Sequence, residues 1–134
     1  MPITYSLDQV NRVVRSRAWG MLSNDDLHSY YHKLIADVRF NRDFRELLDL
    51  SGVRDFLVET YLIAEVAAWP AFQEGTRRAF VAVSDLAFGL SRMFATYADC
   101  VGQRVEVFRE KRDAEEWLDY CALSAPELPP SCAA

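Results

Sequence analysis

The segment that decides the fold runs from Arg78 to Leu86 and reads Arg-Ala-Phe-Val-Ala-Val-Ser-Asp-Leu. Its part from Ala79 to Val83 has five apolar residues in a row, which is typical of a strand buried on both sides in a parallel sheet. Ser84 and Asp85 then match a helix start, because serine caps free amide groups and an acidic residue favours the positive end of the helix dipole. The segment therefore predicts a central strand followed directly by a helix.

The same alternation extends to both sides of this segment. The helix after Ser84 should end at Gly102, and Arg104 to Phe108 is the next predicted strand. Before the central strand, Leu47 to Leu50 predicts a short strand that Ser51-Gly52 breaks, and a helix from about Val58 to Trp69 ends at Pro70. The predicted apolar stripe of the helix after Ser84 consists of Leu86, Leu90, Met93, Phe94, Tyr97 and Val101.

The two ends of the chain add two further strands and two further helices. Ile3 to Leu7 and Arg12 to Ala18 alternate apolar and polar residues, which predicts a β-hairpin that Gly20 ends. A helix capped by Ser23 or Asn24 should run to about Val38. Its predicted inner face is Leu27, Tyr30, Tyr31, Leu34, Ile35 and Val38. Asp113 begins a last amphipathic helix with the inner face Ala114, Trp117, Leu118 and Cys121.

These elements give the order β-β-α-β-α-β-α-β-α. Strands that alternate with helices at this spacing predict an α/β fold whose sheet is mainly parallel, with right-handed crossovers. We expect five strands, an N-terminal hairpin at one side and four helices mainly on one face. Residues 1–123 should form a single domain, and residues 124–134, with three prolines, are predicted to be a disordered tail.

The composition limits the classes of function. The chain has 134 residues and a net charge of -5, which argues against nonspecific binding of nucleic acid. The longest uncharged run, Val66 to Gln73, is far short of the ~20 residues that span a bilayer. The three cysteines, Cys100, Cys121 and Cys132, form no CxxC pair and fit free thiols. The N-terminus lacks the pattern of a signal peptide. We therefore expect a protein of the bacterial cytoplasm.

Motifs that carry chemistry are sparse. No GxGxxG or GxxxxGK[ST] pattern occurs, so no nucleotide cofactor is expected. His28 and His32 are spaced to face one metal ion, but no third ligand is indicated, and a solvated helix face is the better interpretation. Asp49 ends a strand, and Ser51 and Ser84 follow strands, but no acid, base or nucleophile is evident as a partner for them. We expect no catalytic residues, no metal and no cofactor.

The second helix is the most informative candidate for binding. Between Thr60 and Trp69 its only charged residue is Glu65, and a helix that is apolar nearly all round is usually buried on more than one face. It is either sandwiched within the domain or in contact with a partner subunit or a small apolar ligand. We expect Trp69 and Phe72 near the surface, and a two-fold homodimer formed through this helix. The candidate interface or ligand patch consists of Tyr61, Leu62, Trp69, Phe72, Phe88 and Met93.

Five segments of the sequence carry a family resemblance: Leu48 to Val53, Arg77 to Ala82, Ser84 to Phe94, Val105 to Arg109 and Ala114 to Leu118. In these segments and their arrangement, the chain resembles the STAS, or SpoIIAA-like, superfamily of anti-sigma-factor antagonists and their relatives. The same fold also resembles the lipid-binding CRAL-TRIO domain. The resemblance implies a SpoIIAA-like domain that binds a protein partner, such as an anti-sigma-like factor.

Regulatory members of this superfamily carry a phosphorylatable serine where the second helix begins. That place falls near Val58 to Thr60 in this chain, and no serine stands there. Thr60, with a shift of about one residue, and Ser51 are the candidate phosphoacceptors, and we predict that neither is modified. We expect a regulatory, non-enzymatic protein-interaction module. The alternative is a binder of a small, lipid-like ligand, with a pocket lined by residues such as Trp69, Phe88 and Met93.

Overall fold

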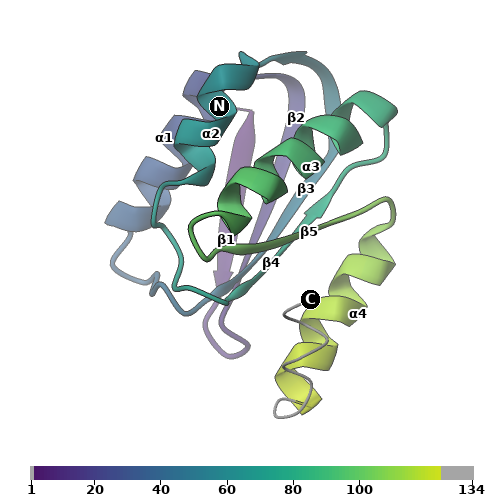
Figure 1. Cartoon of the computed structure of the whole chain (residues 1–134). Coiled ribbons are helices and arrows are strands. Elements are labelled where there is room, and N and C mark those ends of the chain that lie inside the picture. Colours follow the sequence, from purple (N-terminus) through teal and green to yellow (C-terminus); the bar gives the residue numbers. More distant parts are fainter. Residues whose placement is uncertain (1, 125–134) are drawn as a thin grey trace.

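The computed structural model describes the backbone of residues 2–124 and the side chains of residues 2–119 (Figure 1). The predicted order of strands and helices is confirmed. The elements are β1 (Ile3–Asp8), β2 (Val13–Ser23), α1 (Asn24–Ala36), β3 (Arg45–Leu57), α2 (Thr60–Ala67), β4 (Arg77–Val81), α3 (Asp85–Asp99), β5 (Arg104–Phe108) and α4 (Lys111–Ser124).

The five strands form one sheet in the order β1-β2-β3-β4-β5. β1 pairs with β2 in antiparallel fashion, and every later pair is parallel, as predicted. Helices α1, α2 and α3 cover one face, where Leu48 and Phe80 are buried. α4 packs on the other face against Leu47 and Ala79. Residues that alternate along β3 and β4 therefore belong to two separate cores, since successive side chains of a strand point to opposite faces.

Serine caps start two of the helices as the sequence predicts. The Ser23 hydroxyl accepts a hydrogen bond from the amide of Asp26, whose carboxylate in turn accepts one from the Ser23 amide. The Ser84 hydroxyl accepts from the amide of Ala87 at the start of α3. These contacts satisfy amides that the first helical turn leaves without a partner.

Two strands are longer than the sequence suggests. Gly20, with φ of 73°, does not end β2, and Ser51-Gly52 does not break β3. β3 pairs with β4 only as far as Asp49, whereas it pairs with β2 up to Leu57. We call the paired segments 19–23 and 52–57 the β2–β3 arm. The prediction failed because pairing with a neighbouring strand outweighs the local preferences of glycine and serine.

Several expected core positions lie at the surface instead. Val38 follows the end of α1 and is 97% exposed, and Ile35 is 44% exposed. Val83 is 55% exposed because the chain leaves the sheet after Val81. Tyr97, Val101 and Leu86 of the predicted stripe are exposed as well. The side chain of Cys121 and the predicted tail after Ser124 lie outside the described residues.

Candidate functional site

A buried polar network occupies the layer between the sheet and α1. The guanidinium of Arg78 donates its Nε–H to Glu46 at 2.8 Å, and these side chains are 2% and 0% exposed. Tyr30 and Tyr31 of α1 donate their hydroxyls to the same carboxylate at 2.8 and 3.1 Å. Gln103 accepts from Arg78 at 3.0 Å and donates to the carbonyl of Phe72. The network ties α1, β3, β4 and the start of β5 together.

Burial and the neighbouring charges together determine the protonation states of the side chains in this network. Burial raises the pKa of Tyr30 and Tyr31 well above the usual value, and the carboxylate of Glu46 raises it further. Burial alone would lower the pKa of Arg78, but Glu46 beside it raises the pKa overall. Both tyrosines therefore remain neutral donors and Arg78 remains a cation. A fully satisfied buried network of this kind specifies packing and offers no open position for a substrate.

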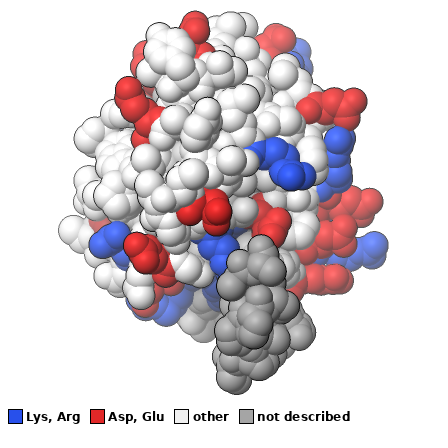
Figure 2. All heavy atoms as spheres, viewed as in Figure 1, with Lys and Arg blue, Asp and Glu red and all other residues white. Residues whose placement is uncertain are grey.

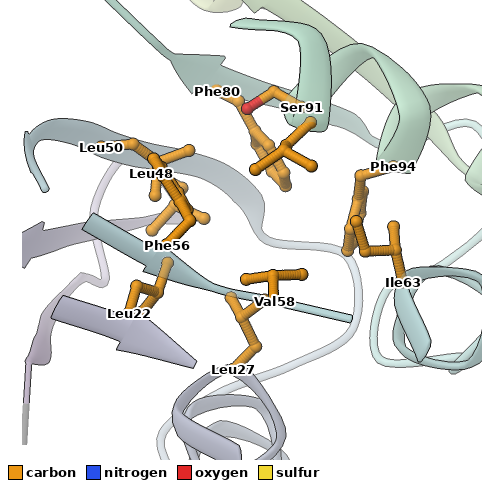
Figure 3. Close-up of a pocket in the computed structure, with 11 residues that line it drawn as sticks. Leu22, Leu27, Leu48, Leu50, Phe56, Val58, Ile63, Phe80, Ser91 and Phe94 are labelled. Carbon is orange, nitrogen blue, oxygen red and sulfur yellow. The ribbon is translucent and has the colours of Figure 1, made fainter. Parts of the chain in front are cut away.

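An apolar cavity lies next to this network, towards the carboxyl ends of the strands. Its volume is about 40 Å³. Figure 3 shows its lining side chains, which come from β2, α1, β3, α2, β4 and α3. Ser91 contributes the single polar side chain in that lining. The lining consists of Leu22, Leu27, Leu48, Leu50, Phe56, Val58, Ile63, Phe80, Leu90, Ser91 and Phe94.

The size of the cavity limits what it holds in this conformation. Engineered cavities that bind benzene have volumes of about 150 Å³, so 40 Å³ is too small for a lipid chain. The three residues expected to line a ligand pocket, Trp69, Phe88 and Met93, are not among the side chains that surround it. This cavity lies deeper than the predicted pocket, between the sheet and the inner faces of α2 and α3, and the pocket beside Trp69, Phe88 and Met93 stays a prediction.

The apolar character of α2 is explained largely by packing within the domain. Ile63, Val66 and Ala67 are buried in the main core, and Leu62 is half-buried. Phe72 is fully buried, where it lies 4.4 Å from the guanidinium of Arg78, so the expectation that it lies near the surface is wrong. The chain after Pro70 turns inward and places the ring of Phe72 in the core, whereas the sequence predicted a surface loop.

Trp69 lies against α1 and is half-buried. Its ring centroid is 4.8 Å from the centroids of both His28 and His32. The two imidazoles therefore pack on the indole, and the i, i+4 spacing that suggested a metal pair serves here as a stacking surface. Among the described residues, no group of three or more metal-ligating side chains occurs. No described helix is long and apolar enough to cross a membrane.

Several of the large exposed apolar side chains lie towards the carboxyl end of the sheet. Leu57 at the end of β3 and Tyr61 in the first turn of α2 are 59% and 72% exposed. Val83 and Leu86, between β4 and the first turn of α3, are 55% and 58% exposed. We call these four residues the carboxyl-end patch. Figure 2 shows that the surface over α2 on this side carries few charged atoms.

The candidate phosphoacceptors occupy different positions. Thr60 is the first residue of α2 and is exposed, after an N-cap Glu59 whose side chain makes no capping hydrogen bond. Ser51 lies within β3, where its amide donates to the carboxylate of Asp49. Thr60 alone therefore stands at a helix start, next to Tyr61 of the carboxyl-end patch. Phe88 and Met93 are half-buried on α3, and Phe88 packs under the guanidinium of Arg109 at 4.2 Å.

Comparisons with known proteins bear on the fold. No protein-family model matches the chain, and no curated protein sequence matches it. The structure is similar to that of an uncharacterised DUF3478-family protein from Shewanella loihica PV-4, which is described as SpoIIAA-like. The TM-score is 0.54 at 18% identity, and the match covers 87% of this chain and 91% of that chain.

The chain has a SpoIIAA-like fold. This confirms the α/β architecture with one antiparallel pair that the sequence predicts. A fold of this kind is consistent with protein partners, but fold alone does not assign a function. The function has to be argued from the surfaces and cavities of this chain.

Proposed function

We propose that the chain is a non-enzymatic, regulatory protein-interaction module whose partner binds at the carboxyl-end patch. The observation that carries the proposal is the exposure of four large apolar side chains at one end of the sheet, each more than half exposed. Large apolar side chains that are exposed towards one end of a domain are typical of a binding surface. The polar network beneath α1 is satisfied by contacts within the domain, which fits a structural role for these buried side chains.

A second copy of the chain is one partner that this surface fits. The homodimer predicted from α2 loses Phe72 as a contact, because that ring is buried, but keeps Tyr61 at the exposed start of the helix. Burial of one such aromatic side chain contributes roughly 2 kcal/mol. A Tyr61→Lys substitution should therefore weaken a dimer at this surface by about tenfold or more.

Site-specific photocrosslinking in cells tests the proposal. A photoreactive phenylalanine analogue replaces Tyr61 in one variant and Val38 in a control variant. Val38 is 97% exposed and follows α1 at the other end of the molecule. We expect a discrete adduct from position 61 and none from position 38. An adduct of twice the chain mass identifies a homodimer, and another mass identifies a different partner. Equal, diffuse labelling at both positions would contradict the proposal.

Phosphorylation would act on the same surface. Phosphate on Thr60 would place about two negative charges beside Tyr61, which opposes apolar contact. We nevertheless predict that Thr60 and Ser51 are unmodified in the cell, because no serine stands at the start of α2, Thr60 matches the pattern only with a shift of about one residue, and Ser51 is remote from the helix start. Detection of either phosphosite by mass spectrometry of the purified cellular protein would restore partner switching by phosphorylation.

Binding of a small apolar ligand is a second candidate, favoured by the cavity. Its lining is apolar except for Ser91, and the β2–β3 arm contributes Leu22 and Phe56 to it. A ligand larger than a few methyl groups requires this cavity to widen. Native mass spectrometry of the protein from cells, compared with a Ser91→Phe variant that fills the cavity, separates this function from the first. A bound mass present in the wild type and absent from the variant supports the ligand.

A further inference from the structure

A polar cleft lies at the opposite end of the sheet from the carboxyl-end patch. Its volume is about 330 Å³, and it opens where β3 and β4 begin. Arg45 and Arg77 are the first residues of these strands and stand side by side, because the next residues along, Glu46 and Arg78, are paired in the sheet. The turn before β2 and the loop before β4 complete the walls.

The described lining of the cleft carries more positive than negative charge. Arg12, Arg45 and Arg77 face a single carboxylate, that of Asp43. Asp43 is paired with Arg12 at 2.6 Å. A local excess of arginine is notable in a chain whose net charge is -5. The cleft is therefore a place where a small anion is attracted within a molecule that otherwise repels it.

Arg45 is held rigidly by neutral groups. Its Nη1 donates to the carbonyl of Leu118 at 2.7 Å, and its Nη2 donates to the carbonyl of Asn11 at 2.6 Å. A guanidinium has five N–H donors, so these two bonds leave the other donors for a further acceptor. Backbone carbonyls fix the orientation of Arg45 without cancelling its charge. A cation that is oriented before a ligand arrives binds with less loss of entropy.

Arg77 forms the wall beside it. Its Nη1 donates to the carbonyl of Trp117 at 3.2 Å, and its guanidinium lies 4.5 Å from the centre of that indole. Arg104 lies 5.8 Å from the same ring. Both contacts keep positive charge close to the cleft. Arg77 is already engaged with α4, so its donors are not counted for binding in the cleft.

Thr76 adds a hydroxyl group to the same space. It lies half-buried in the cleft, directly after Gly75, whose φ of 80° makes the turn. The amide of Thr76 donates to the carbonyl of Gln73, whereas its hydroxyl makes no hydrogen bond with any described residue. A hydroxyl beside an oriented guanidinium is a common donor pair for oxyanions.

We propose that this cleft binds a small oxyanion of the phosphate type, with Arg45 and the Thr76 hydroxyl as the main donors and Arg12 at the rim. The planar fork of arginine matches the oxygen spacing of phosphate. The contacts with Asn11 and Leu118 account for the position of Arg45, but they account neither for the hydroxyl of Thr76 nor for the open volume. The site is independent of the partner surface at the other end of the strands.

Titration followed by ¹H–¹⁵N NMR tests the site, with inorganic phosphate as one ligand and glycerol 3-phosphate as the other. Each titration is matched by sodium chloride at equal ionic strength. We expect saturable shifts of the amides of Gly75 and Thr76. Arg45→Gln should weaken binding roughly tenfold to a hundredfold, and Thr76→Val roughly threefold to tenfold. Tighter binding of the ester assigns the cleft to a phosphate ester, and tighter binding of phosphate assigns it to the free ion.

Matched variants keep the test decisive. Thr76→Val preserves shape and leaves α4 in place, so it remains informative if Arg45→Gln loosens that helix. Arg17→Gln removes an exposed arginine of β2 outside the cleft and should bind as the wild type does. Shifts that chloride reproduces, the absence of saturation, or equal affinity of Thr76→Val and the wild type would each overturn the proposal.

Discussion

The two halves of the layer between the sheet and helices α1–α3 are built on opposite principles. In the half nearer the start of the strands, Glu46 and Arg78 form a buried ion pair that two tyrosines complete. Two residues further along the same strands and on the same face, Leu48 and Phe80 line an apolar cavity. Two residues further along β3 and β4, the interior thus changes from hydrogen-bonded polar side chains to apolar side chains that surround a cavity.

The difference teaches where this domain tolerates change. Each buried polar group in the first half has partners fixed in distance and direction, so the loss of one member leaves others unsatisfied. Apolar contacts in the second half are non-directional, and a cavity already present there allows side chains to shift. The apolar half is therefore the part that can change shape to accommodate a ligand or a partner. The polar half fixes a single alignment of α1 on the sheet.

Removal of Arg78 should produce the largest effect. Arg78→Met leaves Glu46 buried without its cation, and such a break costs about 3–5 kcal/mol. Denaturant unfolding followed by circular dichroism measures the loss. The double variant Glu46→Gln, Arg78→Met should be more stable than Arg78→Met alone, because it also removes the unpaired charge. If Arg78→Met costs less than about 1 kcal/mol, the two halves do not differ as described.

A change of one oxygen atom should produce the next largest effect. Tyr31→Phe removes a hydroxyl that donates to Glu46 and accepts from Arg78 at 3.0 Å. We expect a loss of about 1–3 kcal/mol in the free energy of unfolding. The matched control is Tyr97→Phe, since Tyr97 is an exposed tyrosine of α3 and should change stability little. Equal effects at both tyrosines would show that burial of the polar network is unimportant.

Alkaline pH should act mainly on the polar half. Folding raises the pKa of Tyr30 and Tyr31 above 10.0. Their contribution to the free energy of unfolding is therefore fully present below pH 10 and is lost as the pH rises further. Above pH 10, each tyrosine that ionises only on unfolding lowers the free energy of unfolding by about 1.4 kcal/mol per pH unit. Unfolding curves between pH 9 and 11 measure the slope. The slope for Tyr31→Phe should be shallower, and an identical slope would contradict the assignment.

Filling the cavity should produce the smallest change, and one of opposite sign. Ser91→Val adds apolar volume to the lining and removes its single polar group. We expect a gain of roughly 0.5–2 kcal/mol, as other cavity-filling substitutions give. Thr96→Val on the exposed side of the same helix is the matched control. A marked loss of stability with Ser91→Val would mean that the cavity is not available to a side chain.

Much of this fold could be predicted, because the apolar periodicity of the strands and helices and the serine caps are local signals. The long β3 could not, since Ser51 and Gly52 form a strand only through pairing with β2. The sequence does contain one pattern that indicates the polar network. Glu46 is in phase with Leu48, and Arg78 is in phase with Phe80, so opposite charges on the inner face of neighbouring strands pointed to a buried pair.

The surface sites were harder to predict. Phe72 was expected near the surface because Pro70 was expected to turn the chain outward, whereas the ring is buried and packs on Arg78. Tyr61 belongs to the predicted interface or ligand patch and is exposed in the structure, whereas the exposure of Val83 depends on where β4 ends. The arginine cleft joins segments more than 60 residues apart, and only the register between β3 and β4 brings Arg45 next to Arg77.

The strand order has a consequence for how the chain acquires its structure. Every strand pairs with the one that precedes it in the sequence, so β1 to β5 can be added one after another to a growing edge. No strand has to be inserted between two that are already paired, which keeps loop closure short and favours rapid folding. During synthesis, the hairpin, α1 and β3 can associate before the ribosome has made β4. Until Arg78 emerges, however, Glu46 has no cation, so the nascent sheet carries an unpaired charge that α1 alone cannot neutralise.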